Sequence, residues 1–153
     1  MRYRHSFEIA APVAAVDAFH RRPESLRQIT PPVAPVRIRG NPPQRLAAGD
    51  ELSVTFFVGV VPVRWRAVIE AHPDLQAGES GFQDRQLEGP FRRWTHRHRF
   101  VPLAPDRTRV DDEIEAEPRR HPLWGPVALQ MALALPVLFR YREWKTRRLL
   151  HGG

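Results

Sequence analysis

Apolar and polar residues alternate over the first nine positions of the chain. One face of this segment carries Tyr3, His5, Phe7 and Ile9, and the residues between them are polar or charged. A repeat of two residues is typical of a strand that buries one of its faces. The pattern therefore predicts a half-buried strand over these positions.

The next segment changes to the spacing of a helix. Pro12 suits the first turn of a helix because its fixed backbone angle is already close to helical. Three apolar residues then recur at helical spacing before Pro23, namely Val13, Val16 and Phe19. We predict one short helix here and a second over residues 23–29. The following stretch is rich in proline and glycine, so it is predicted to be loop with at most one short strand, at residues 36–38.

From residue 50 onward the alternation typical of strands returns. Two runs flank Gly59, and we predict that they pair as a hairpin with Gly59 in the turn. Their apolar positions are Leu52, Val54, Phe56 and Val58 before the turn, and Val63, Trp65, Ala67, Ile69 and Ala71 after it. Further strands are predicted at residues 80–87, 91–101 and 107–117, which together form an antiparallel meander.

Charges predict how the last two strands pair. If residues whose numbers sum to 210 face each other, arginines oppose acids on one face: Arg99 with Asp111, Arg97 with Glu113 and Arg93 with Glu117. A slip of one residue would mix this ladder with apolar positions, so the charged face is predicted to point outward. The inward face then places His98 opposite Asp112. For the preceding hairpin, a three-residue loop at residues 88–90 predicts that Asp84 lies near Trp94.

The C-terminal part is predicted to be one long helix, from Leu123 to about Leu149. Its first half, residues 123–139, is apolar except for Gln130, so we expect this half to be the more deeply buried. Pro136 removes a backbone donor and predicts a bend or a break. A membrane span is the alternative for this half, but the run is shorter than the roughly 20 residues of a typical span and contains glycine and proline.

Composition narrows the class of protein. A chain of 153 residues suits one domain, which we place at residues 1–150 with a tail at residues 151–153. The absence of cysteine excludes disulfides and thiolate chemistry. The formal net charge of +7 invites nucleic-acid binding, but no nucleic-acid motif accompanies it, so we expect no nucleic-acid partner. No apolar run follows the charged N-terminal residues, so no secretory signal is predicted and a cytoplasmic protein is expected.

Several blocks of the sequence resemble the START-like, or SRPBCC, superfamily, and in particular a bacterial branch similar to polyketide cyclases and dehydrases. The resemblance rests on residues 7–12 with Val16 and Phe19, on residues 26–32, and most strongly on residues 82–91 and 94–100. It implies an α+β helix-grip fold, in which a curved antiparallel sheet of about seven strands wraps around the C-terminal helix. It also implies a cavity between sheet and helix, in proteins that bind lipids, sterols or polyketides and sometimes catalyse reactions.

Polar residues on the predicted inward faces are the candidates for chemistry. Asp84, His96, His98 and Asp112 are the candidate catalytic residues, and Gln86 shares their face. A carboxylate beside an imidazole raises its basicity, as a general base requires. The simpler interpretation is that these groups satisfy each other's hydrogen bonds inside the fold. A metal site at His96 and His98 is a further alternative, but the resemblance suggests none, and we expect neither a metal nor another cofactor.

Large aromatic residues on the inward faces predict the wall of a small-molecule pocket. The predicted ligand-binding residues are Phe56, Trp65, Phe82, Asp84, Trp94, His96, His98, Phe100, Met131 and Leu135, and Ala128 and Ala132 are the positions where a larger side chain should fill the cavity. The leading hypothesis is a domain that binds or carries a hydrophobic or amphipathic small molecule. The first alternative is a cyclase-like or dehydratase-like enzyme that uses an inward His/Asp pair.

The second alternative uses the basic end of the chain. Weak contact with a membrane surface, or with another protein, would involve Arg140, Arg142, Lys145, Arg147 and Arg148, because cations near a helix end attract anionic headgroups. Nothing in the sequence indicates the oligomeric state.

Overall fold

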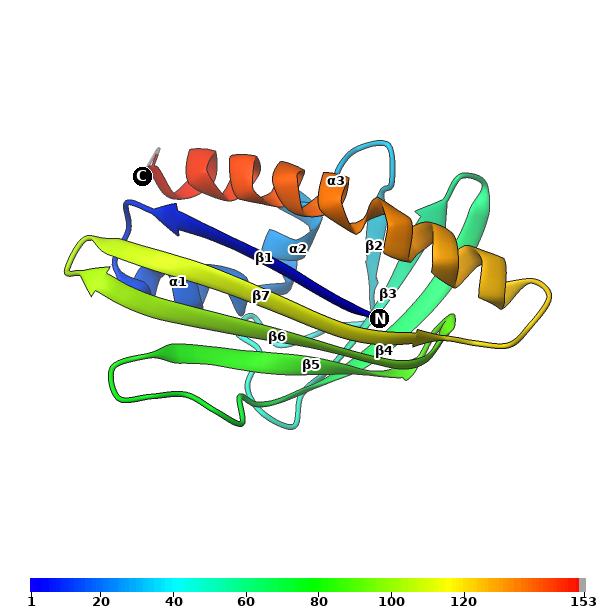
Figure 1. Ribbon diagram of the computed structural model, residues 1–153, viewed down its shortest axis with the longest axis horizontal. Coiled ribbons are helices and arrows are strands. Elements are labelled where there is room, and N and C mark those ends of the chain that lie inside the picture. The colour runs from blue at the N-terminus through cyan, green and yellow to red at the C-terminus, as the bar shows by residue number, and fades with distance from the viewer. Residues whose placement is uncertain (152–153) are drawn as a thin grey trace.

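The computed structural model describes residues 1–151 and contains a seven-stranded antiparallel sheet in the order β1-β7-β6-β5-β4-β3-β2 (Figure 1). Its elements are β1 (Arg2–Ile9), α1 (Val13–His20), α2 (Pro23–Gln28), β2 (Val36–Arg39), β3 (Glu51–Val58), β4 (Val61–Ala71), β5 (Ser80–Glu88), β6 (Phe91–Ala104), β7 (Arg107–Pro118) and α3 (Trp124–His151). The predicted helix-grip architecture is confirmed. The predicted tail at residues 151–153 lies outside the described residues except for His151, which ends α3.

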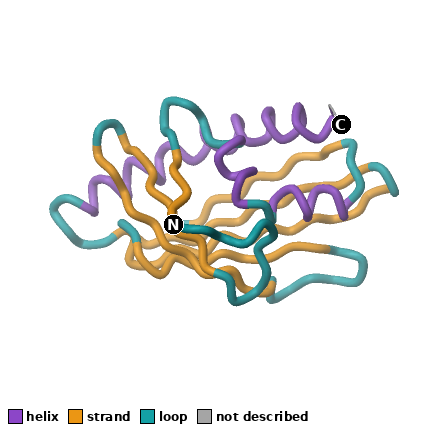
Figure 2. Tube along the Cα trace, turned by 180° about the vertical axis from the view of Figure 1, so that it is seen from behind, coloured by secondary structure: helices purple, strands orange, loops and turns teal. Residues whose placement is uncertain are grey.

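The three helices pack against the same face of the sheet. Figures 1 and 2 show α3 extending along the sheet, with α1 near the end that α3 reaches last and α2 closer to the middle. From α3, Phe139 contacts the ring of His96 on β6, with ring centroids 5.6 Å apart. From α1, His20 contacts Phe100 on the same strand, at 4.8 Å. The inner face of β6 is therefore covered by α3 at one place and by α1 at another.

The first half of α3 is less buried than the sequence predicted. Its inward stripe includes Ala128, Leu135 and Phe139, which are at most 3% exposed. Its outward stripe is open to solvent, with Leu133 73% and Val137 72% exposed. The sheet contacts only one side of the helix, so apolar residues on the other side remain uncovered.

Pro136 does not break α3. The helix is continuous from Trp124 to His151 with the proline inside it. Figure 1 shows its two halves running at different inclinations, which fits the bend that a missing backbone donor allows. Within residues 1–151, no helix combines the length and the apolar character that crossing a membrane requires.

Two predicted hairpins form, and the register predicted for the β6–β7 hairpin is confirmed. Leu52 pairs with Ala67 and Val54 with Trp65, and the turn between their strands contains Gly59 at a φ of 60°, a conformation that favours glycine. In the β6–β7 hairpin, His98 faces Asp112 as predicted. The predicted outer pairs face each other as well: Arg99 and Asp111, Arg97 and Glu113, and Arg93 and Glu117. Arg99 nevertheless donates to the carbonyl oxygen of Asp74 at 2.6 Å, while Asp111 accepts from Ser6 and Arg109.

The predicted register of the β5–β6 hairpin is wrong by two residues. Asp84 pairs with His96 and not with Trp94. The side-chain amide of Gln86 donates to the carbonyl oxygen of Phe91 at 2.7 Å and accepts from the Phe91 N–H at 3.3 Å. This side chain takes the place of a backbone partner near the turn, so regular pairing begins only at Arg85. A shift of two residues preserves the faces, so Asp84 still points inward.

The hydrophobic core consists of two clusters. One includes Trp65, Trp94, Ile114 and Phe139, together with other residues of β3, β4 and α3. The other contains Phe7, Val16, Phe82, Phe100 and Val110, among others, and lies under α1. Along the inner face of β6, Trp94 belongs to the first cluster and Phe100 to the second. His96 and His98 lie between them, so the core is interrupted by a polar centre.

Candidate functional site

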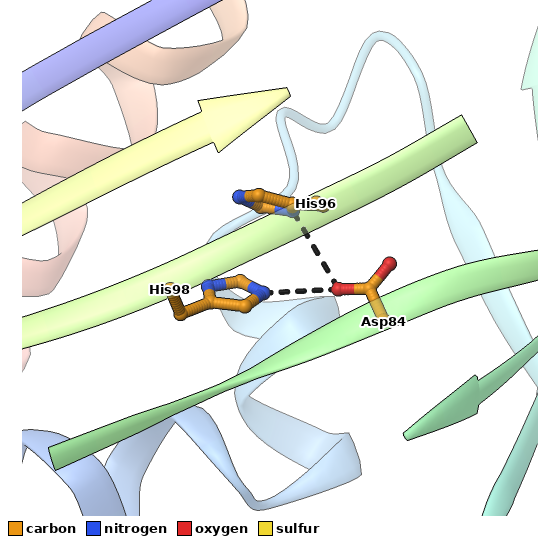
Figure 3. Close-up of side chains that lie close together, drawn as sticks. All are labelled: Asp84, His96 and His98. Atoms are coloured by element: carbon orange, nitrogen blue, oxygen red, sulfur yellow. Dashed lines mark hydrogen bonds and ion pairs between the residues drawn. The ribbon is translucent and has the colours of Figure 1, made fainter. Parts of the chain in front are cut away.

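Two carboxylates and two imidazoles form a closed ring in this polar centre. Asp84 on β5 accepts a hydrogen bond from Nε2 of His98 at 3.0 Å, and Asp112 on β7 accepts one from Nε2 of His96 at 2.9 Å. The other two sides are longer: Nδ1 of His96 lies 3.6 Å from Asp84 Oδ2, and Nδ1 of His98 lies 3.2 Å from Asp112 Oδ1. Figure 3 shows Asp84 directed at both imidazoles.

The four groups strongly perturb one another's protonation. Burial alone would lower the pKa of His98, but Asp112 and Asp84 override it and raise this pKa to about 9. Burial and the charge of His98 lower the pKa of His96. The pKa values of Asp84 and Asp112 would be raised by burial, yet the histidines hold both below their usual range. At neutral pH the ring therefore contains two carboxylates, one imidazolium at His98 and one neutral imidazole.

His20 on α1 extends the site, and sequence analysis did not single it out. Its ring lies 6.2 Å from that of His98, and its Nδ1–H donates to the Val16 carbonyl oxygen at 2.8 Å. Burial lowers the pKa of His20 to about 4, so the ring is neutral and Nε2 is an acceptor. Asp17 holds α1 in place because it accepts hydrogen bonds from Ser80 on β5 and from Arg21.

Arg142 on α3 also belongs to the site. The sequence hypothesis placed it among basic residues near membrane headgroups, but it is half-buried and lines the cavity. Its guanidinium carbon lies 5.2 Å from the centroid of the Phe139 ring. Its position on the helix was a usable signal, since it follows Phe139 by three residues and Leu135 by seven, the spacing of one helix face.

A cavity of about 400 Å³ lies between the sheet and α3. Its wall is mostly apolar and includes residues of β3, β4, β5, β6, α2 and α3. Its charged and imidazole groups are Asp84, His96, His98, His20, Arg142 and the exposed Arg22. Small-molecule pockets in proteins span roughly 300–1,000 Å³ and combine an apolar wall with a few polar groups. The cavity has the size and composition of such a pocket.

Most of the predicted ligand-binding residues line this cavity. They are Phe56, Trp65, Phe82, Asp84, Trp94, His96, His98, Met131 and Leu135. Phe100 does not line it, because this fully buried ring packs against Phe82 and His20 in the second core cluster. Ala128 and Ala132 are also buried away from the cavity wall. The part of each residue in ligand binding stays a prediction.

Three of the ring residues also have the spacing of metal ligands. Asp84, His96 and His98 each bring one ligand atom within 4.8 Å of the others. Two imidazoles and a carboxylate are a donor set suited to zinc. Nε2 of His98 donates a hydrogen bond to Asp84, and the raised pKa of His98 favours a proton that a metal would have to displace. Nε2 of His96 donates to Asp112, which leaves a lone pair on Nδ1, the nitrogen that faces Asp84. Of the three groups, His98 is thus the one whose protonation opposes a bound metal.

Comparisons with known proteins agree with this geometry. The chain is similar over its full length to an aromatase/cyclase from Streptomyces sp. R1128, with 17% identity, a TM-score of 0.68, and coverage of 100% of this chain and 98% of the other. A START superfamily protein from Mycobacterium smegmatis matches with 16% identity, a TM-score of 0.68 and coverage of 99% and 97%. A norcoclaurine synthase mutant from Thalictrum flavum matches with 16% identity, a TM-score of 0.66 and coverage of 99% and 94%.

These identities are low, so the structural matches establish the fold alone. No curated protein is detectably similar in sequence. The family model described as polyketide cyclase / dehydrase and lipid transport matches residues 9–134, which is well over half of the chain. The match includes the strands that carry the ring and the first part of α3. The chain therefore belongs to the polyketide cyclase/dehydrase and lipid transport family.

Proposed function

We propose that the protein binds a hydrophobic or amphipathic small molecule in the cavity between the sheet and α3. The observation that carries this proposal is the cavity itself, about 400 Å³ of space with a mostly apolar wall and a few charged groups. Apolar side chains gain packing contacts when an apolar body lies against them. A ligand with an apolar body would supply those contacts, and its polar end would meet Asp84, His98 or Arg142.

The test fills the cavity from a position on its wall. Ala67 is buried on the inner face of β4 and lines the cavity, whereas its neighbour Val68 lies on the other face. Ala67→Phe should weaken binding of a neutral hydrophobic dye at least tenfold while leaving thermal stability unchanged or higher, because the ring replaces empty space. Val68→Phe is the matched control and should bind the dye as the wild type does.

Native mass spectrometry of the freshly purified protein would complement the dye measurement by revealing a copurified compound. Equal dye binding by wild type and Ala67→Phe would contradict the cavity as the binding site. A wild type that binds neither the dye nor any member of a lipid panel would contradict the proposal as a whole.

Acid–base catalysis is the second candidate function, and the protonation of His98 favours it. A pKa of about 9 makes His98 a proton donor at neutral pH, and not the general base that the sequence suggested. Both nitrogens of His98 face carboxylates, so a ligand oxygen would have to displace one of these contacts to take its proton. Such an oxygen, becoming negative during a cyclisation or a dehydration, would be stabilised by the proton of His98. The aromatase/cyclase among the structural neighbours is consistent with this chemistry.

The catalytic candidate is tested with a compound already found to bind. The wild type should convert it, and His98→Gln should lose turnover while retaining binding. Conversion at the same rate by His98→Gln would exclude His98 as the donor.

A further inference from the structure

Arg142 differs from Arg21, which also reaches the interior. Arg21 donates to Asp17 at 2.8 Å and to the Gly81 carbonyl oxygen at 2.9 Å, so its charge has a partner. Within residues 1–151, Arg142 forms no hydrogen bond or ion pair, and its Nε has no solvent exposure. Its guanidinium carbon lies 5.2 Å from the centroid of the Phe139 ring. The cavity wall thus contains a cation that has no hydrogen-bond or ion-pair partner among residues 1–151.

The acids nearest to Arg142 are occupied. Asp84 and Asp112 attract its charge, but both direct oxygens at the histidines, and neither forms an ion pair with the guanidinium. Burial lowers the pKa of Arg142, which expresses the cost of holding the cation away from water. The ring has two carboxylates and one imidazolium, so it keeps one net negative charge. The positive charge of Arg142 balances that charge from a distance. The guanidinium N–H groups are still available to another acceptor.

We infer that the natural ligand is an apolar molecule with one carboxylate group, and that Arg142 binds this carboxylate. The inference rests on the proposed function and adds the chemical class of the ligand. A guanidinium presents parallel N–H donors that match the two oxygens of a carboxylate, and such paired bonds are strong where water is excluded. The apolar wall receives the body of the ligand, while its charged end lies against the Phe139–Arg142 side of α3.

The test compares ligands that differ only in charge. Decanoate and decanamide have the same chain length, and each is titrated against a neutral dye bound to the purified protein. The wild type should bind decanoate at least about tenfold more tightly, since one strong charge-assisted contact is worth that factor or more. Arg142→Gln should bind both compounds equally, at the affinity that the wild type has for the amide. Arg140→Gln, an exposed neighbour with the same loss of charge, is the control and should keep the preference.

The outcomes separate this inference from the proposed function. Equal affinity of the wild type for acid and amide, or an acid preference that survives in Arg142→Gln, would overturn the carboxylate assignment and leave the cavity as a binding site. If the wild type binds neither compound and does not bind the dye, the carboxylate assignment and the proposed function are both overturned. If Arg142→Gln does not fold, Arg142→Lys decides: a cation without the paired donors should lose most of the acid preference, and full retention would contradict the inference.

Discussion

The two faces of the β6–β7 hairpin pair opposite charges in different surroundings. On the outer face, Arg97 lies 3.0 Å from Glu113, and about a quarter of each side chain is exposed. On the inner face, the next residues along the same strands, His98 and Asp112, are within 3.2 Å of each other and about a tenth exposed. The spacing is nearly the same, but the outer pair competes with water and the inner pair does not.

Burial decides what each pair contributes. Exposed ion pairs contribute about 0–1 kcal/mol, because water and salt screen them. Losing one partner of a buried pair costs about 3–5 kcal/mol, because the other charge is left without compensation. The inner pair raises the pKa of His98 to about 9, which keeps this side chain protonated at neutral pH. The same charge pattern is thus a surface feature on one face and a candidate site on the other.

The largest effect should come from adjacent substitutions on β7. Asp112→Asn should lower the free energy of unfolding by about 3 kcal/mol or more, because it leaves the His98 cation with one carboxylate in place of two. Glu113→Gln should change it by less than about 1 kcal/mol. Urea denaturation at pH 7 measures both. Equal effects would show that the inner face is as well hydrated as the outer one.

The second prediction concerns alkaline pH. The pKa of His98 is about 9 in the folded protein and about 6.5 in the unfolded chain, so the folded state holds the proton more tightly. This contribution is complete below pH 6.5 and is lost as pH rises to 9, which should reduce stability by up to about 3 kcal/mol. His96 and His20 have lowered pKa values and therefore act below this window.

The control for this prediction is again the neighbouring residue on the other face. His98→Gln should remove the alkaline loss of stability, whereas Arg97→Gln should preserve it, since this substitution on the outer face leaves His98 and its two carboxylates in place. Urea denaturation at several pH values gives both profiles. A flat wild-type profile from pH 6.5 to 9 would contradict a protonated His98.

The smallest effect concerns the outer pair. A double-mutant cycle with Arg97→Gln and Glu113→Gln should give a coupling energy below about 1 kcal/mol that falls further at high salt. Arg97 also contacts Glu115 at 3.2 Å, and Glu113 also contacts Arg4 at 2.6 Å, so either single substitution leaves a partner for the remaining charge. A coupling above 2 kcal/mol would remove the distinction between the two faces.

The sequence predicted these faces because alternation and charge gave the same register. Arg93, Arg97 and Arg99 all had an acid opposite them only when the position numbers summed to 210, so the position of Asp112 beside His98 followed. The β5–β6 register was missed because a side chain, Gln86, replaces backbone pairing near the turn, and no sequence periodicity records such a bond. The sequence likewise did not predict that Asp84, His96, His98 and Asp112 form a ring, because this arrangement requires the correct register in both the β5–β6 and the β6–β7 hairpins.

The helical contributions to the site were harder to predict. Residues 123–139 are apolar nearly all round, so periodicity alone did not show which stripe of α3 faces the sheet. Arg142 was consequently assigned to the surface, although its spacing from Leu135 and Phe139 placed it on the buried stripe. His20 ends α1 and follows the buried Val16 by four residues, but the sequence did not show that this helix would lie beside His98.

The place of β1 in the sheet has a consequence for how the chain folds during synthesis. β1 lies at the edge of the sheet beside β7. The paired residues Arg2 of β1 and Glu115 of β7 are separated in sequence by nearly the whole meander. At about 5–20 residues per second, a ribosome needs roughly 5–20 seconds to add the hundred or so residues between them. During that interval β1 has no partner strand and the cavity has no lid, because α3 is made last. Pairings between residues so far apart in sequence form slowly, so a nascent chain paused before β7 exposes apolar strand faces to chaperones and to other chains.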